Sequence, residues 1–274
     1  MKITPKIFYV LIFVSSYMFS QNTTHEIGVL TGTAALQTDY GLRGDMLSTT
    51  ANNSTSFTIA HYMQLSGLSQ SWNKRSSILD HIIIKSEFNY IQSVDLRHPH
   101  VKLSPKTILE NKTRDGNQTF SSKEVLGSMK GNISLMNLGF QLEYYLKDLT
   151  EFFNGTQQSR FNPFFNFGFN YSLYSNSVTS DLGDWHTDKS LLPEKYRAEG
   201  AIKEGKGGAL GFNTGVGSRY RLSEKLDIVA QFKWEIYTSD SIDGLQANVV
   251  ENKSNETLTN LQVGLIYHLN FSKR

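Results

Sequence analysis

The sequence predicts an all-β protein: an eight-stranded antiparallel up-and-down transmembrane β-barrel with long outer loops. Three observations predict it. Eight stretches alternate between apolar and polar residues, these stretches are longer than the strands of most soluble sheets, and no comparably long stretch has the pattern of an amphipathic helix. Alternation with a period of two indicates a strand, because successive side chains of a strand point to opposite faces.

The clearest example is FNPFFNFGFNYSLYS, residues 161–175. Every odd position from Phe165 to Leu173 is large and apolar, and the even positions between them are small or polar. A typical globular strand has about 5–6 residues, and this stretch is roughly twice as long. It is therefore long enough to cross a bilayer when tilted.

The other stretches repeat this pattern with varying strictness. The first two alternate weakly, and the third opposes isoleucines and aromatics to charged residues. The sixth is rich in glycine on its polar face, and the seventh and eighth oppose large apolar residues to amides, charges or histidine. In chain order, the expected strands are HEIGVLTGTAAL (25–36), SFTIAHYMQL (56–65), HIIIKSEFNYI (81–91), ISLMNLGFQLEYYL (133–146), FNPFFNFGFNYSLYS (161–175), GALGFNTGVGSRYRL (208–222), LDIVAQFKWEIY (226–237) and NLQVGLIYHLNF (260–271).

The dense apolar faces are expected to touch lipid, since a membrane barrel is apolar outside and polar inside. A soluble lipocalin-like barrel needs the reverse arrangement, with its apolar residues inside. Periodicity alone does not separate the two, but the strand lengths, the aromatic density and an export signal favour the membrane. The residues expected to face lipid include Phe165, Phe167, Phe169, Leu138, Phe140, Leu142, Phe232, Trp234, Val263 and Leu265.

The opposite faces gather charged residues that are expected to fill the barrel interior. One interpretation is a path for ions or solutes. The other is a network of salt bridges, which we favour because eight strands leave room only for side chains and buried charges must be paired. The expected polar network of the barrel interior consists of Lys85, Glu87, Glu143, Arg219, Arg221, Asp227, Lys233 and Glu235.

The connections give an independent indication of a barrel. Their lengths are roughly 19, 15, 41, 14, 33, 3 and 17 residues, judged from the alternation pattern. The first, third, fifth and seventh are expected to be the outer loops, each longer than the inner connections beside it. Ten strands are the alternative, with a further hairpin in 92–130, where TFSSKEVLG has some extended character, or in 175–207.

The N-terminal segment has the layout of a secretory signal peptide. Lys2 and Lys6 precede an apolar run, and small residues precede Gln21. We expect residues 1–20 to be the signal peptide, cut after Ser20, and 21–274 to be the barrel domain. An uncleaved anchor is the alternative, but the apolar run is shorter than the ~20 residues of a spanning helix.

Composition excludes several classes of function. The chain has no cysteine, which excludes disulfides, a lipid-modified cysteine anchor and any cysteine-based site. Without Lys2 and Lys6, the 27 basic residues fall to 25 and match the 25 acidic ones, so no basic excess remains to bind nucleic acid.

Sequence motifs predict no cofactor, no metal site and no catalytic residue. DLGDWHTD (181–188) and HPH (98–100) lie in expected loops, and neither matches a metal-binding template. A lipid-modifying enzyme is an alternative, with His61 near Ser56 or Ser66, but no nucleophile motif supports it.

The end of the chain, LIYHLNFSKR, looks like the closing strand of outer-membrane barrels, with Phe271 as the aromatic insertion signal. THEIGVLTGTAALQTDYGLRGD (24–45) and GVGSRYRLSEKLDIVAQFKWEIYTSDSIDGL (215–245) resemble a family of exported, functionally uncharacterised small outer-membrane β-barrel proteins with OmpA/OmpX-like architecture. The resemblance implies location in the cell outer membrane and contact with membrane lipids, lipopolysaccharide and the barrel-insertion machinery.

For function, we expect a non-enzymatic barrel with a structural or surface-interaction role through its extracellular loops. The ligand of those loops cannot be named from the sequence. The alternatives are a narrow channel for small solutes and a lipid-modifying outer-membrane enzyme.

Overall fold

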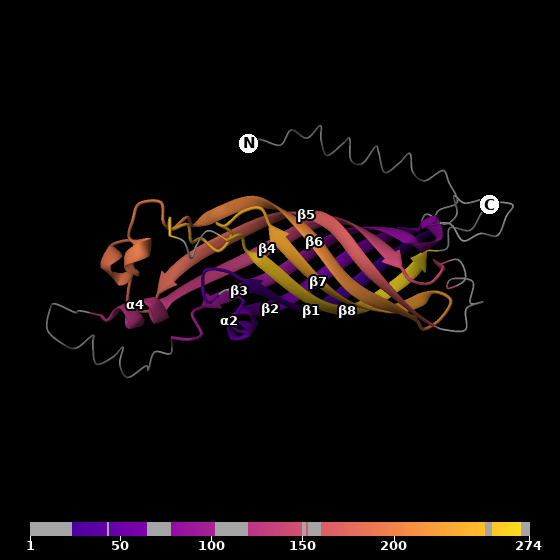
Figure 1. Cartoon of the computed structure of the whole chain (residues 1–274), viewed down its shortest axis with the longest axis horizontal. Helices are drawn as coiled ribbons and strands as arrows, with labels where there is room; N and C mark the ends of the chain where they lie inside the picture. The colour runs from indigo at the N-terminus through magenta and orange to yellow at the C-terminus, as the bar shows by residue number, and fades with distance from the viewer. Residues whose placement is uncertain are drawn as a thin grey trace, which may run out of the picture.

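The chain folds into a closed antiparallel β-barrel in which each strand pairs with its sequence neighbours and β8 returns to pair with β1 (Figure 1). The computed structural model describes residues 24–42, 44–64, 78–101, 120–149, 152, 160–249 and 254–269. The predicted fold class is confirmed. The strands are β1 (Thr24–Gln37), β2 (Asn53–Gln64), β3 (Ile82–Arg97), β4 (Met129–Tyr145), β5 (Phe161–Ser180), β6 (Gly205–Arg221), β7 (Leu226–Tyr237) and β8 (Thr257–Leu269).

Short helices lie in the connections at the ends of the barrel. They are α2 (Met46–Ala51), η3 (Ile78–His81), α4 (Ser122–Ser128), η4 (Lys189–Leu191) and η5 (Glu194–Tyr196). None of the helices in the described part of the chain is long and apolar enough to span a bilayer.

The ten-strand alternative is wrong for the described residues, because both suspected segments lengthen strands that were already expected. β3 continues to Arg97 and β4 begins at Met129, while β5 continues to Ser180 and β6 begins at Gly205. The stretch that seemed extended contains α4 instead. Its S-x-x-E pattern forms a capping box, in which the Ser121 side chain accepts from the Glu124 amide and Glu124 accepts from the Ser121 amide.

The two ends of the barrel carry different connections. β1 begins and β8 ends at the same end, where His25 lies opposite Leu269. Segments 65–81, 146–160 and 222–225 connect strands there, and 38–52, 98–128, 181–204 and 238–256 connect them at the other end. Outer-membrane barrels keep their termini on the periplasmic side, so the second set is the outer end.

The expectation that every outer loop exceeds its inner neighbours is wrong for the first loop. Loop 38–52 is not longer than the inner connection 65–81. β2 already begins at Asn53, where serine and threonine obscure the alternation, so the true loop is shorter than its sequence pattern indicates.

A continuous apolar belt surrounds the barrel on its outward face. On β4 the belt runs from Met136 to beyond Tyr144, and all its outward side chains are exposed. Its upper edge follows the strand register, since Met136 pairs with Tyr90 on one side and Leu173 on the other. The stretch from Met136 to Leu146 rises about 25 Å on a strand tilted by about 40°, which matches the apolar band of a membrane barrel.

Above the belt the outward face of the sheet becomes polar and the inward face becomes apolar. On the outer part of β4 the outward residues become Ser134, Asn132 and Lys130, while Leu135 and Ile133 point inward and are buried. This extension therefore resembles a soluble barrel, with a polar exterior and an apolar centre. We call that centre the outer apolar core, which comprises Ala34, Leu36, Tyr40, Ile91, Val94, Leu96, Met129, Ile133, Leu135, Val178, Leu192, Tyr196, Ala201, Ala209, Tyr237, Ile242, Leu245, Ala247 and Leu258.

A second buried group, the inner apolar cluster, lies toward the periplasmic end. It consists of Leu30, Ala60, Tyr62, Ile83, Tyr145, Leu149, Phe164, Val229 and Ile266. The strands around the interior are so close that some inward positions accept only glycine. A Cβ at Gly168 would lie 2.1 Å from the Phe140 carbonyl oxygen, and one at Gly264 would lie 2.2 Å from that of Val29.

Candidate functional site

The barrel interior below the outer apolar core holds a network of charged side chains, which reaches to the periplasmic ends of β1, β7 and β8. At its centre Glu87 accepts from two lysines: the Lys85 ammonium lies 2.9 Å from its Oε2, and Lys233 contacts its Oε1. Gln141 also donates to the Glu87 carboxylate, at 2.7 Å. All of these side chains are buried, so each charge is compensated by a neighbour rather than by water.

A second centre surrounds Arg219, nearer the periplasmic end. Its guanidinium lies 2.6 Å from Glu26 and 3.9 Å from Asp227. His268 connects the same two carboxylates, with Nδ1 3.0 Å from Glu26 and Nε2 3.0 Å from Asp227. The aromatic ring of Tyr62 lies under the guanidinium, 4.6 Å away, and holds it on a second side.

Glu143 joins the two centres. Its carboxylate lies 3.7 Å from Lys85 and 3.8 Å from Arg219, and it accepts a 2.6 Å hydrogen bond from the Tyr145 hydroxyl. Glu235 extends the network outward, 3.5 Å from Lys233. The structure thus brings seven of the expected interior residues together, namely Lys85, Glu87, Glu143, Arg219, Asp227, Lys233 and Glu235.

Arg221 stands apart from the network. It is half-buried at the periplasmic end of β6 and donates to the backbone carbonyls of Ser223 and Phe152. Sequence reasoning also misses Glu26, because the alternation of β1 is weak. The even-numbered positions of β1 could have revealed it, since Glu26 lies on the same face of the strand as the inward Gly28 and Leu30.

Among the described residues, the only group close enough to hold a metal ion is Glu26, Asp227 and His268, whose ligand atoms lie within 4.8 Å of one another. Arg219 contacts both carboxylates of this group. A permanent cation therefore already takes the place that a metal ion would need, and the arrangement fits an ion-pair cluster better than a metal centre.

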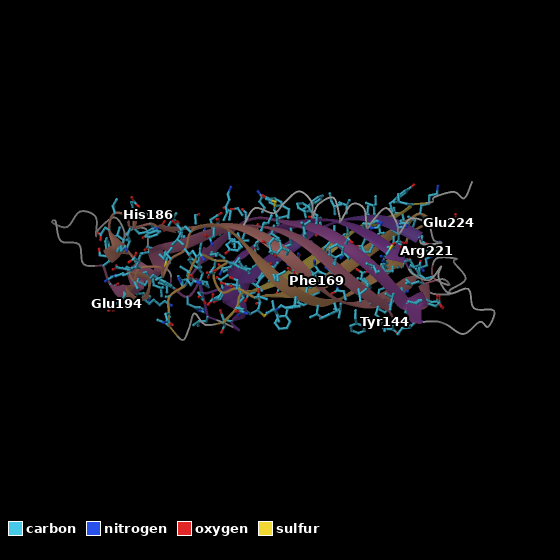
Figure 2. The ribbon with its side chains drawn as sticks, turned by 90° about the horizontal axis from the view of Figure 1, so that it is seen from above. Tyr144, Phe169, His186, Glu194, Arg221 and Glu224 are labelled. Atoms are coloured by element: carbon cyan, nitrogen blue, oxygen red, sulfur yellow. The ribbon has the colours of Figure 1, made fainter. Side chains whose placement is uncertain are left out.

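The residues expected to face lipid all lie on the outward face of the barrel. Their exposure runs from 44% for Phe140 and Trp234 to 64% for Phe167. Phe169 lies midway along the barrel, between His186 and Glu194 at one end and Arg221 and Glu224 at the other (Figure 2). The others are Phe165, Leu138, Leu142, Phe232, Val263 and Leu265.

The outer end carries the two loop motifs that the sequence singles out. In 181–188, Asp184 accepts from the His186 amide and Asp188 from that of Ser190, so both cap local turns, whereas Asp181 lies 2.7 Å from the Lys130 ammonium. The His186 ring instead lies 3.4 Å from Glu204. The HPH motif forms a tight turn in which the Val101 amide donates to the His98 carbonyl.

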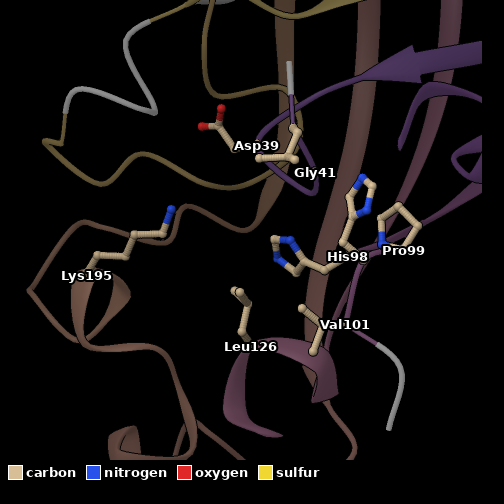
Figure 3. A pocket seen from close by; sticks show the side chains of 9 residues that line it. Asp39, Gly41, His98, Pro99, Val101, Leu126 and Lys195 are labelled. Atoms are coloured by element: carbon tan, nitrogen blue, oxygen red, sulfur yellow. The ribbon is translucent and has the colours of Figure 1, made fainter. Parts of the chain in front are cut away.

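The turn at His98 lines a cleft of about 290 Å³ between three outer segments (Figure 3). Asp39 and Gly41 come from the loop after β1, Leu126 from α4, and Lys195 from η5. His100 is turned toward α2, where its Nε2 lies 2.8 Å from Asp45. That contact, followed by hydrogen bonds from Ser48, lowers the pKa of Asp45 to about 2.

Of the residues considered for a lipid-modifying enzyme, the described pair His61 and Ser56 does not form a dyad. Ser56 points into the barrel and donates to Asn260 at 2.9 Å. His61 is exposed on the opposite face of β2 and lies 3.0 Å from the ring of His25. Ser66, the segment 1–20 that is expected to be a signal peptide, and Phe271 lie outside the described residues.

Comparison with known proteins gives distant structural similarity. No family model matches the chain, and no curated protein matches it by sequence. A major outer membrane protein from Thermus thermophilus is similar with a TM-score of 0.48 and 13% identity over 90% of this chain and 99% of that one. Ail of Yersinia pestis, in complex with sucrose octasulfate, gives 0.41 and 9%, and Neisserial surface protein A gives 0.41 and 10%, each over 90% of this chain and 99% of the other.

The physical features of the chain itself identify its type. A closed sheet satisfies its backbone without edges, as a membrane requires. The apolar belt has the height of a hydrocarbon layer, and the belt encloses a buried polar interior. The chain is therefore a small eight-stranded β-barrel of the outer membrane.

Proposed function

We propose that this protein is a closed, non-enzymatic barrel that presents its outer loops as a surface for interaction. The observation that carries the proposal is the filling of the interior by side chains along its length. Tyr62, Lys85 and Phe164 are buried toward the periplasmic end, Lys233 farther along the barrel, and Tyr237 at the outer end of β7. Such an interior supports a structural role over conduction.

The construction of the outer end supports the second half of the proposal. Loop residues pack into the outer apolar core, and hydrogen bonds fix the loops to one another and to the strand β5. The Asp39 amide donates to Asp243 at 3.1 Å, and Asn176 donates to the Ile242 carbonyl at 2.9 Å. Trp185 likewise donates to the Val178 carbonyl. Loops anchored in this way keep a fixed shape, which favours recognition of a partner at low entropic cost.

Membrane lipids and lipopolysaccharide are the proposed partners of the outward face. The belt suits acyl chains, and above it Lys130 and Lys206 point outward where anionic headgroups would lie. We also propose that the barrel-insertion machinery assembles the chain, through the C-terminal aromatic Phe271.

Conductance in planar lipid bilayers tests the closed-barrel proposal. The purified protein, inserted and folded, should give no steady current above that of the bare bilayer. Heat-modifiable gel mobility of the same sample verifies that the protein is folded, so that an absence of current cannot be attributed to unfolded protein. Stable unitary currents would favour the small-solute channel instead.

The enzymatic alternative is tested through its products. Lipids from cells with and without the protein should give the same mass spectra, because Ser56 and His61 lie on opposite faces of their strand. A lipid species that depends on the protein would contradict the non-enzymatic role.

A further inference from the structure

The cleft at the outer end has the composition of a ligand site. Its walls are mostly apolar, with Leu42, Pro99, Val101 and Leu126, and a few polar groups converge on it. Its volume of about 290 Å³ is close to the lower limit of pockets that hold small molecules. In Figure 3, Lys195 and Asp39 lie on one side of the cleft, and His98 and Pro99 lie on the other.

His98 carries a buried polar atom that the protein leaves without a partner. Its Nε2 is shielded from solvent and makes no hydrogen bond. The turn over 98–101 and the Tyr40 ring, 5.4 Å away, hold the imidazole in place. Burial, and then the neighbouring Lys195 ammonium, lower the pKa of His98 to about 4, so the ring is neutral at neutral pH. A neutral imidazole nitrogen lining a cleft is available to a polar atom of a ligand.

Charged side chains of both signs line the cleft. Asp39 supplies a carboxylate and Lys195 an ammonium group, from two different loops. An anion would meet Asp39 and a cation would meet Lys195, so neither is favoured by the cleft as a whole. A molecule that carries both charges complements it.

We propose that this cleft binds a small zwitterion with an apolar side chain, of the chemical class of the aliphatic and aromatic α-amino acids. The inference rests on the proposed role of the outer loops in surface interaction, and it names the ligand class. The ligand carboxylate pairs with Lys195 and accepts from His98 Nε2, which selects the tautomer protonated there. Its ammonium group pairs with Asp39.

The side chain of the ligand packs against Val101 and Leu126. Leu126 and Lys195 also line a second cavity, of about 630 Å³, whose other walls are the apolar Phe120, Val125 and Pro193 and the polar Ser122, Glu194 and Arg197. The shared residues place this cavity directly beside the cleft and leave room for a large side chain. Phenylalanine should therefore bind more tightly than glycine, which offers the same charges without apolar surface.

Saturation-transfer NMR on the full-length protein in lipid nanodiscs tests the proposal. The probes are L-phenylalanine, N-acetyl-L-phenylalanine without the ammonium charge, L-phenylalaninamide without the carboxylate, and glycine. L-phenylalanine should bind best, and loss of either charge should weaken binding about two- to fivefold, as for a partly exposed ion pair.

Charge variants make the assignment specific. Asp39→Asn should weaken binding of L-phenylalanine and leave N-acetyl-L-phenylalanine unchanged, whereas Lys195→Gln should spare L-phenylalaninamide. Lys189→Gln, an exposed lysine of the same loop, is the matched control and should change nothing. Heat-modifiable mobility identifies any variant that fails to fold. The relative binding of the four probes to the parent protein then still tests the proposed ligand class.

Two results overturn the proposal. One is that L-phenylalanine does not bind at millimolar concentration. The other is that all four probes bind equally, which marks partition into lipid. A barrel that fails this test yet stays closed in planar bilayers disproves the ligand class and leaves the proposed function standing.

Discussion

Arg219 is the largest of the fully buried side chains, and it holds together the periplasmic half of the interior. Its guanidinium contacts acidic groups from three other strands, Glu26 on β1, Glu143 on β4 and Asp227 on β7. Buried charges of this kind depend on one another, because removing one leaves its partners uncompensated in a medium of low dielectric constant. Arg219, Glu26 and Asp227 are almost fully buried, so little water can replace a lost partner.

Replacing Arg219 with methionine should lower the free energy of unfolding by about 3–5 kcal/mol, as expected when one member of a buried ion-pair network is removed. Urea-induced unfolding in lipid vesicles measures the change. Arg221→Met, two residues along the same strand, is the matched control. It removes only hydrogen bonds to backbone carbonyls at the rim and should cost about 1 kcal/mol. Equal losses in both variants would show that the network does not stabilise the barrel.

His98 should make stability depend on pH. Its pKa is lowered from 6.5 to about 4 in the folded protein, first by burial and then by Lys195. Between these two values the unfolded chain binds a proton that the folded chain does not, so stability falls as pH falls through this window. His98→Phe keeps the ring volume and removes the titration. Its urea midpoint should fall less between pH 7 and pH 4.5 than that of the parent, and parallel curves would contradict the assignment.

At the scale of elements, the polarity of the strands changes along their length. On β5 the outward residues are apolar up to Leu173 and then become Ser175 and Ser177, while Val178 turns into the outer apolar core. Sequence alternation predicts the lower part well, since lipid outside and polar groups inside give a strong contrast. It misses the upper part for two reasons. Serine, asparagine and glycine weaken the alternation there, and above the belt the outward face is polar while the inward face is apolar. The strands consequently extend further than the alternation indicates.

Substituting arginine at two outward positions of β5 tests where the membrane ends. Phe167→Arg places a charge near the middle of the belt and should cost about 2–4 kcal/mol or block insertion. Ser177→Arg lies on the same face of the same strand but above the belt, and it should fold like the parent. Heat-modifiable mobility after refolding into vesicles reports both outcomes. If the two variants behave alike, the belt does not face lipid.

At the scale of the whole molecule, the interior holds a charged network interleaved with the inner apolar cluster, and an outer apolar core beyond them. Parity along single strands predicts the charged network, because each charge lies opposite a dense apolar face. It does not predict the outer core or the cleft at His98, which form where loops from distant parts of the sequence converge. The HPH motif is visible in the sequence, but Asp39 and Lys195, which line the same cleft, are brought beside it only in the folded chain.

The central claim is that the lower barrel lies in the membrane and the extension above it in water, and accessibility along β5 tests this most directly. The chain has no cysteine, so single cysteines at outward positions 165, 167, 169, 171, 175, 177 and 179 can each carry one spin label. In lipid bilayers, labels up to 171 should collide with dissolved oxygen and be protected from a water-soluble nickel complex, and labels from 175 onward should show the opposite. Labels at 167 and 169 that are as accessible to nickel as the label at 177 would contradict the account and indicate a soluble barrel.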